Sequence, residues 1–239
     1  MIQLEGVAKS YGSKRAVTDL SLEVRAGEVF AFLGANGAGK TTTIKMLVGL
    51  LLPDAGRLHL GGHDVVAQPR EASRIVGYVP DQPYLYDKLT GREFLQFVAD
   101  MHGMETAAAR ASIDEQVSLF RLEDFVDRLA EVYSHGMKQR LVFAAALVHR
   151  PRVIILDEPM VGLDPLHMRV VKDRLRELAD SGTTVFMSTH TLPLAEEIAD
   201  RIGVIKEGCL QFVGSVASLR EQRQQAHESL EKLFLDMTS

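Results

Sequence analysis

A glycine-rich stretch that ends in lysine and threonine, residues 34–41, is the part of this 239-residue sequence best suited to chemistry. Its spacing is G-x-x-x-x-G-K-[ST], and an apolar run precedes it. Glycines let successive backbone N–H groups turn toward an anion, and a following helix adds its free N-terminal amides. Lysine supplies positive charge to phosphate oxygens, and threonine offers a hydroxyl to Mg²⁺. The stretch therefore predicts the phosphate-binding loop of a nucleotide site. The residues expected to contact the nucleotide there are Gly34, Asn36, Gly37, Gly39, Lys40, Thr41 and Thr42.

Two adjacent carboxylates, Asp157 and Glu158, form a second candidate group directly after the apolar run 153–156. Such a pair is often surface charge when it stands alone, but here it accompanies a phosphate-binding loop. The first carboxylate at the end of a strand can hold Mg²⁺, directly or through water. The second can orient or deprotonate a water that attacks the γ-phosphate. A small GTPase would also need an Asn-Lys-x-Asp motif, which this sequence lacks.

The composition narrows the class of protein. Hydrophobic residues make up 46% and charged residues 25%, as is usual for a soluble globular protein. The net charge of −5 argues against a nucleic-acid surface, and the single Cys209 excludes a disulfide framework. No secretory leader opens the sequence, and the longest apolar run, 141–148, is too short to span a membrane. We therefore expect a cytoplasmic protein whose membrane role, if any, comes through a partner.

The elements that must position these residues follow from apolar patterning and turn signals. Strands are expected at 2–7, 16–24, 29–33, 57–60, 63–66, 75–79, 153–156, 184–187, 202–206 and 209–213. Helices are expected after the glycine-rich stretch to about Gly49, and at 90–103, 106–120, 123–129, 134–148, 167–179 and 192–199. A charged tail from Ser215 onward, with leucines that include Leu219, Leu230 and Leu233, predicts a weakly amphipathic helix.

These elements predict an α/β fold with a mostly parallel sheet, because strands alternate with helices. An antiparallel β subdomain is expected at the N-terminus. Residues 88–150 are helical almost throughout, which predicts a helical lobe inserted into the α/β core. The main domain is expected to cover residues 1–215 and the helical tail residues 216–239.

The ordered motifs together resemble the nucleotide-binding domain of ATP-binding-cassette (ABC) transporters over residues 1–215. The matching positions, beside the glycine-rich stretch and the Asp157–Glu158 pair, are Tyr11, Gln82, the signature segment 133–140, the D-loop 162–164 and the segment 188–190. The resemblance implies ATP and Mg²⁺ as ligands. It also implies that Tyr11 stacks on adenine, that Gln82 ligates Mg²⁺ or positions water, and that His190 binds the γ-phosphate and the attacking water.

The signature segment implies a dimer. In the family, the helix that Ser134 and Gly136 begin faces the γ-phosphate held by the other subunit, and Asp164 would align that interface. The present segment departs from Leu-Ser-Gly-Gly-Gln at Tyr133, His135 and Met137. The side chain of His135 restricts how closely the backbone approaches phosphate. Tyr-Ser-x-Gly-Met also resembles the ABC-2, exporter-associated branch.

The sequence thus predicts a Mg²⁺-dependent ATPase subunit that powers a separate transmembrane permease, as a homodimer or paired with a paralogous ATPase. It would lie on the inner face of the membrane and bind no nucleic acid. Two other hypotheses remain open at this stage. One is a soluble ABC ATPase of DNA maintenance or translation, and the other is an ATP sensor that does not hydrolyse ATP. The transported substrate cannot be identified from this chain.

Overall fold

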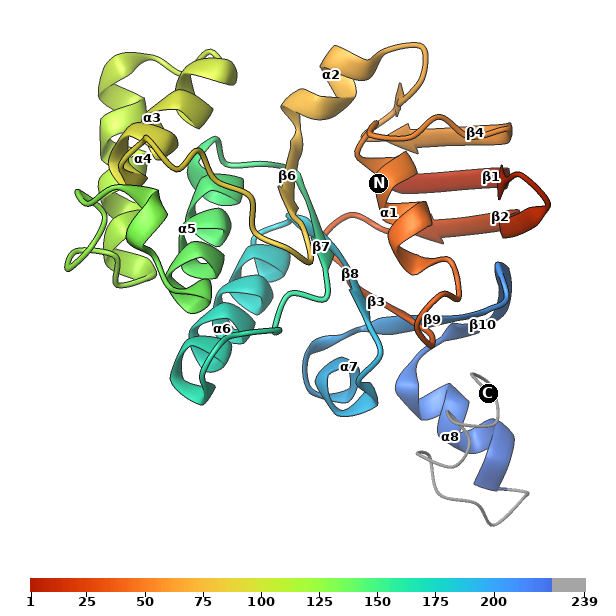
Figure 1. The fold of residues 1–239 in the computed structure, drawn as a ribbon. Coiled ribbons are helices and arrows are strands. Elements are labelled where there is room, and N and C mark those ends of the chain that lie inside the picture. Colours follow the sequence, from red (N-terminus) through yellow and green to blue (C-terminus); the bar gives the residue numbers. More distant parts are fainter. Residues whose placement is uncertain (225–239) are drawn as a thin grey trace.

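Two sheets form the centre of the computed structural model, which describes residues 1–224 (Figure 1). The four-stranded sheet is antiparallel and has the order β2-β1-β4-β5. Its strands are β1 (Ile2–Tyr11), β2 (Lys14–Val24), β4 (Ala55–Leu60) and β5 (His63–Asp64). The hairpin expected after the first helix is therefore part of the N-terminal antiparallel sheet.

The six-stranded sheet has the order β10-β9-β3-β8-β7-β6, and only the β9–β10 pair is antiparallel. Its strands are β3 (Val29–Leu33), β6 (Val76–Val79), β7 (Val153–Asp157), β8 (Thr184–Thr189), β9 (Arg201–Lys206) and β10 (Cys209–Gly214). Every residue of β3, β7 and β8 is buried, because these central strands are covered on both faces. The predicted fold class, with its antiparallel subdomain and mostly parallel sheet, is confirmed.

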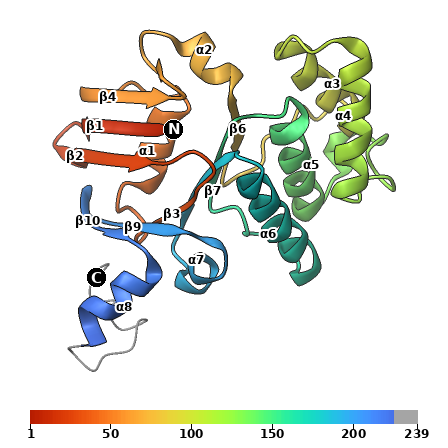
Figure 2. The ribbon, with the colours of Figure 1, turned by 180° about the vertical axis from the view of Figure 1, so that it is seen from behind.

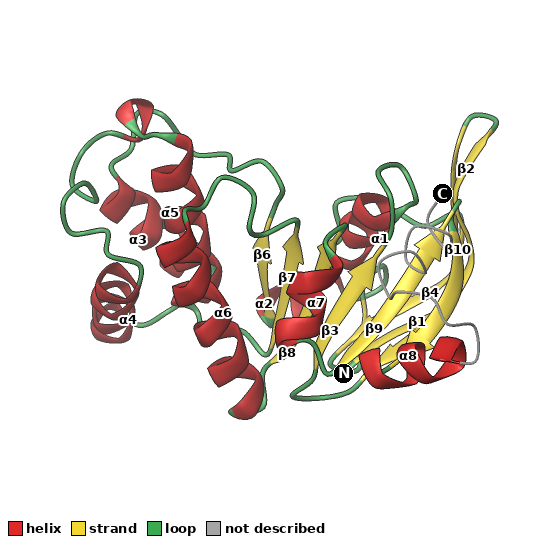
Figure 3. Ribbon diagram, turned by 90° about the horizontal axis from the view of Figure 1, so that it is seen from below, coloured by secondary structure: helices red, strands yellow, loops and turns green. Residues whose placement is uncertain are grey.

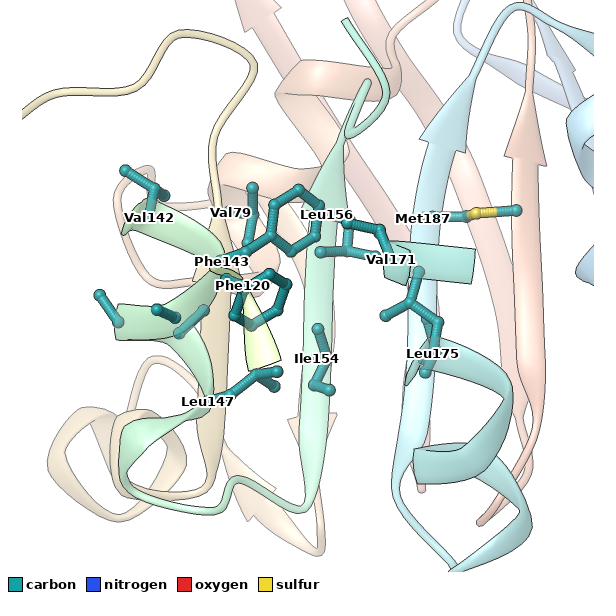
Figure 4. Close-up of a cluster of buried hydrophobic side chains, with 14 of the residues drawn as sticks. Val79, Phe120, Val142, Phe143, Leu147, Ile154, Leu156, Val171, Leu175 and Met187 are labelled. Carbon is teal, nitrogen blue, oxygen red and sulfur yellow. The ribbon is translucent and has the colours of Figure 1, made fainter. Parts of the chain in front are cut away.

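Successive residues of these strands point to opposite faces, so the six-stranded sheet separates two hydrophobic cores. Phe30, Phe32 and Phe186 pack against helix α1 (Lys40–Leu47) and the antiparallel sheet. The alternate residues, such as Leu156 and Met187, face the other core (Figure 4). That core is closed by α5 (His135–Val148), α6 (Pro165–Asp180) and α7 (Leu192–Ile198). The sheet is thus fixed from both sides, which holds the ends of its strands in place.

The helices of the 88–150 segment gather at one end of the molecule, away from the antiparallel sheet (Figure 3). They are α3 (Gly91–Met101), α4 (Thr106–Leu119) and α5. The sequence Thr90-Gly91-Arg92-Glu93 forms a capping box at the start of α3, and Ser134 caps α5 by accepting a hydrogen bond from the N–H of Met137. These local signals were sufficient to place the starts of both helices.

The helix predicted at 123–129 is wrong. This segment forms turns, followed by a short 3₁₀ helix at Ala130–Val132. Its carbonyl groups have partners other than the amides of a continuing helix. The hydroxyl of Tyr133 donates to the carbonyl oxygens of Phe125 and Arg128, and the carbonyl of Val126 accepts from the N–H of Arg92. The tyrosine thus stabilises a looped path in front of the signature segment.

Two smaller differences concern α2 and the C-terminal tail. A short helix not anticipated from the sequence, α2 (Pro69–Arg74), connects β5 to β6. Helix α8 (Val216–Gln224) follows β10 at the edge of the sheet (Figure 2), while Leu230 and Leu233 of the predicted tail helix lie outside the described residues. Within residues 1–224, none of the helices has the length and apolar character needed to cross a membrane.

Candidate nucleotide-binding site

The glycine-rich loop lies between β3 and α1, and its glycines meet geometric demands that other residues would not. Gly39 precedes α1 with φ 112°, and a Cβ there would lie 2.5 Å from the carbonyl oxygen of Ala16. Gly37 also has a positive φ, 82°. At Gly34 a Cβ would lie 2.6 Å from the carbonyl oxygen of Ile205. The loop therefore depends on glycine at all three positions, as a backbone that turns its amides toward an anion requires.

Lys40, the first residue of α1, is only 5% exposed. Its Nζ donates to the carbonyl oxygens of Gly34 at 2.7 Å and Ala35 at 3.2 Å, so the side chain folds back over the loop. The same Nζ lies 3.4 Å from Oε1 of Glu158. The loop that the sequence assigns to phosphates and the carboxylate that it assigns to water activation are thus adjacent.

Glu158 leaves β7 with φ 48°, a left-handed conformation that is uncommon for a residue with a side chain. Its backbone N–H donates to Oγ of Ser188 at 3.1 Å, and its Oε2 lies 2.9 Å from Nδ1 of His190. The Glu158 side chain is 16% exposed, whereas that of His190 is 54% exposed. The other carboxylate oxygen of Glu158, Oε1, is buried and has no hydrogen-bond partner among the described residues. The carboxylate is therefore held in one orientation with one acceptor oxygen available.

Asp157 is almost fully buried, with 1% of its surface exposed. It pairs in register with Ser188 across the β7–β8 ladder, and Oγ of Ser188 donates to its Oδ1 at 2.5 Å. Burial raises the pKa of Asp157, although hydrogen bonds from Ser188 and Thr41 oppose this rise. The negative charges of Asp81 and Glu158 raise the pKa of Asp157 further. A bound cation would compensate for this buried charge.

The donor set around Asp157 fits Mg²⁺ in a nucleotide complex. The carboxylate and the Thr41 hydroxyl are oxygen ligands of the kind that Mg²⁺ prefers. Within residues 1–224, no group of three or more His, Cys, Asp and Glu side chains could hold a metal ion by itself. Magnesium at such sites takes one or two protein oxygens and completes its shell with water and substrate phosphates. The site therefore fits a metal that arrives with a nucleotide.

Two adjoining cavities bring most of the predicted site residues together. The first, of about 220 Å³, is lined by Tyr11, Lys14, Ala16, Asn36, Gly37, Gly39, Lys40, Thr41, Thr42, Asp81 and Glu158. The second, of about 480 Å³, is lined by Asn36, Asp81, Gln82, Pro83, His135, Glu158, Val161 and His190. Asn36, Asp81 and Glu158 line both, so the cavities meet beside the Glu158 carboxylate. Ser134 and Gly136 line neither cavity.

Several polar residues at the site were not predicted to contribute to it, among them Lys14, which lines the first cavity. Ser188 contacts both carboxylates, Asp81 lines both cavities, and the His135 side chain lines the second cavity. The position of Ser188 two residues before the predicted His190 was the available signal, because the ends of neighbouring parallel strands meet at one edge of a sheet. Asp81 directly precedes the predicted Gln82 in the sequence.

A strand, a glycine-rich loop and a helix, with two carboxylates at the end of another strand of the same sheet, define a P-loop nucleotide-binding protein. Comparison with known proteins is more specific. Residues 17–161 match the family model described as ABC transporter. The chain is 42% identical to the daunorubicin/doxorubicin resistance ATP-binding protein DrrA of Streptomyces peucetius, over 92% of this chain and 66% of that protein. It is 44% identical to the Nod factor export ATP-binding protein I of Burkholderia orbicola, over 87% of this chain and 68% of that protein.

Solved structures agree with this assignment. An ATP-binding subunit of an ABC transporter superposes with a TM-score of 0.94 and 30% identity, and all of both chains is covered. A dimeric ATP-binding cassette in a post-hydrolysis state, bound to ADP and Pi, gives a TM-score of 0.84 at 25% identity, over 90% of this chain and 99% of that one. The chain belongs to the ABC transporter family, as an ATP-binding subunit that hydrolyses ATP. It spans about two thirds of the length of the curated relatives it matches.

Proposed function

We propose that this chain is the Mg²⁺-dependent ATPase subunit of an exporter and that it drives a separate transmembrane permease from the cytoplasmic face of the membrane. The observation that carries the ATPase part is the meeting of Lys40, Glu158 and His190 around one pair of cavities. The direction of transport rests on the printed names of the relatives, which include a drug-resistance protein and a Nod factor export protein. Neither name points to DNA maintenance or translation, and no feature of the site favours an ATP sensor without hydrolysis.

Binding of the nucleotide follows from the shape of the first cavity. The amides of the glycine-rich loop and the charge of Lys40 hold the β- and γ-phosphates, assisted by Asn36 and Thr42. Tyr11, which is half exposed at the rim, offers its ring to the adenine. Thr41, Asp157 and the amide oxygen of Gln82 would hold Mg²⁺. When bound, this metal neutralises the charge that develops on the transferred phosphoryl group.

Glu158 acts as the base in the hydrolytic step. Oε1 has no hydrogen-bond partner among the described residues, although Nζ of Lys40 lies 3.4 Å away, and it accepts the hydrogen of a water that lies between it and the γ-phosphate, while Oε2 is engaged by His190. His190, more exposed than Glu158, can turn toward the γ-phosphate once a nucleotide is present. The proton passes to Glu158, and phosphate and ADP are released.

A second chain completes the site in this proposal. Ser134 and Gly136 lie outside the cavities formed by their own chain, at the start of α5, where the first amides of a helix have no acceptor within it. The dimeric cassette bound to ADP and Pi is a similar structure, which supports a pair of chains. The arrangement that the family resemblance implies has each α5 facing the nucleotide of the other chain. The partner can be a second copy or a paralogous ATPase. ATP closes the pair, and hydrolysis reopens it.

Glu158→Gln tests the chemical part of the proposal. The amide cannot accept a proton, so phosphate release should fall to background while ATP affinity and the nucleotide-held dimer persist. Phosphate release and size-exclusion chromatography with Mg²⁺ and ATP measure these two properties. Undiminished turnover in this variant would remove Glu158 from the role of base. Purification from native membranes, followed by identification of an integral membrane protein that co-purifies, tests the coupling to a permease.

A further inference from the structure

The loop that follows Glu158, residues 159–164, rests on the N-terminal half of α5. Nε2 of Gln139, a fully buried side chain, donates to the carbonyl oxygen of Pro159 at 3.4 Å. Further along the loop, Gly162 has φ 81°, and a Cβ at this position would overlap the imidazole of His135. The loop is therefore in contact with α5 at two points before α6 begins.

A third connection runs through His167, near the start of α6. Nη1 of Arg140, on α5, lies 3.1 Å from Nε2 of His167, and Nδ1 of His167 lies 2.7 Å from Oδ2 of Asp164. Arginine can only donate hydrogen bonds, so Nε2 of His167 must be the acceptor. The ring then carries its hydrogen on Nδ1 and donates it to Asp164. The three side chains form a directed chain of hydrogen bonds from α5 to the end of the loop.

Both ends of this chain are anchored. Nη1 of Arg140 also donates to the carbonyl oxygen of Arg121 at 2.9 Å, and its guanidinium lies over the Phe125 ring, 4.8 Å from the centroid. At the other end, Oδ1 of Asp164 accepts from the backbone N–H of His167 at 3.0 Å and caps α6. The His167 side chain is only 15% exposed. A displacement of the loop would thus have to break these bonds.

The loop matters because it directly follows Glu158. Glu158 has a left-handed backbone, which is strained for a residue with a side chain and persists only where neighbours hold it. Ser188 holds the N–H of Glu158 on the strand side. On the C-terminal side of Glu158, the anchored loop 159–164 fixes the direction in which the backbone continues.

We propose that His167 is a positioning residue for ATP hydrolysis: through Arg140 and Asp164 it holds the 159–164 loop against α5 and thereby fixes the Glu158 carboxylate. This inference rests on the proposed role of Glu158. It assigns no contact with the nucleotide to His167. The rate of the hydrolytic step should therefore depend on the hydrogen-bond chain, and nucleotide affinity should not.

Two substitutions of similar size separate the two links. His167→Gln keeps an acceptor near the position of Nε2 but removes the hydrogen donated to Asp164, while His167→Asn keeps a donor near Nδ1 but no longer reaches Arg140. Each should lower kcat for ATP by about tenfold to a hundredfold, the range that a small misplacement of a reacting group produces. Affinity for a non-hydrolysable ATP analogue should stay at the wild-type value. Thermal unfolding of both variants, measured alongside, identifies any loss that is due to unfolding.

A double variant and two reference variants complete the experiment. Arg140→Met should lower kcat to a similar extent, and Arg140→Met with His167→Gln should be no worse than the more severe single variant, because both break one chain. His63→Ala, a half-buried histidine on β5 of the other sheet, should leave kcat unchanged. Glu158→Gln is assayed in parallel.

The outcomes separate this inference from the proposed function. Wild-type kcat in both His167 variants, with an inactive Glu158→Gln protein, would overturn the positioning role alone. An equal loss of analogue affinity and kcat, or losses that multiply in the double variant, would also overturn it, since both results indicate a general structural effect. Full turnover in Glu158→Gln would overturn the proposed function and this inference together.

Discussion

Replacing Ser188 by alanine removes a single oxygen that two carboxylate residues share. Oγ of Ser188 donates to Oδ1 of Asp157 at 2.5 Å and accepts from the N–H of Glu158 at 3.1 Å, in a fully buried position. Loss of a hydrogen bond to a charged group costs about 1.5–3 kcal/mol, and a buried N–H without an acceptor costs about 1–3 kcal/mol. The Thr41 hydroxyl still supports Asp157, so the low end of each range applies. We therefore expect a destabilisation of about 2.5 kcal/mol and, for a domain of this size, a fall in Tm of about 5–10 °C.

A second buried serine provides the matched control. Oγ of Ser112 donates to one neutral acceptor, the carbonyl oxygen of Val148, at 2.6 Å. Ser112→Ala should cost only about 1 kcal/mol, the usual net value of such a bond. Urea unfolding without Mg²⁺ or nucleotide measures both variants. If Ser188→Ala were no more destabilising than Ser112→Ala, the Ser188 hydroxyl would not support the two carboxylate residues.

The pH dependence of the Ser188→Ala effect adds an independent check. Burial raises the pKa of Asp157 above its ordinary value of 3.8, so the native protein holds this proton more tightly than the unfolded chain. The stability that Asp157 contributes is present below the pKa that it has in the unfolded chain, and it is lost as the pH rises through the higher pKa that it has in the native protein. The Ser188 hydroxyl favours the ionised form and limits that loss. The stability difference between wild type and Ser188→Ala should therefore be larger at about pH 7 than at about pH 4, and equal differences would contradict the assignment of this hydrogen bond.

Three further predictions concern other parts of the chain. Lys40→Ala should weaken ATP binding by about 10–100-fold, because the charged hydrogen bonds to phosphate are worth about 1.5–3 kcal/mol; unchanged affinity in titration calorimetry would count against the phosphate-binding loop. Tyr133→Phe should destabilise the protein by about 1–3 kcal/mol, since it removes the hydroxyl that binds the Phe125 carbonyl at 2.7 Å. A melting temperature equal to that of wild type would show that the turns at 121–129 hold without it. Burial lowers the pKa of His149, which stacks on His102, from 6.5 to about 4. The stability that neutral His149 contributes is therefore fully present above pH 6.5 and is lost as the pH falls from 6.5 to about 4. His149→Phe should therefore flatten the fall in stability between these two pH values, and an unchanged slope in urea unfolding would contradict this origin.

Much of the fold could be predicted because its signals are local. The apolar run that precedes Asp157 identifies a strand covered on both faces, and the caps at Thr90 and Ser134 identify the starts of helices. The same holds for the glycine-rich loop, where the glycines themselves indicate a backbone geometry that other residues would not adopt. The unanticipated α2 had a usable signal too, since Pro69 stands at its first position, where proline suits a helix.

What could not be predicted depends on contacts between distant segments. Ser188 is a site residue only because β7 and β8 pair in one particular register, which no stretch of the sequence specifies by itself. The helix expected at 123–129 was excluded by the hydroxyl of Tyr133, a later residue that captures two of the carbonyl groups. The hydrogen-bond chain through His167 likewise joins three separate elements. In each case a polar group acquires its role from tertiary structure.

His135 shows how one of these tertiary contacts changes a sequence-based expectation. As a replacement for glycine in the signature segment, it was expected to limit the approach of the backbone to phosphate. The structure places its imidazole over Gly162, and this position can accept the ring only because the facing residue has no Cβ. The two residues thus form a complementary pair, in which the bulk added to the signature segment is accommodated by a glycine on the loop that follows Glu158. The ring is directed at the loop and at the second cavity, so the departure from the family motif changes how α5 contacts its own chain as well as what α5 presents to a partner.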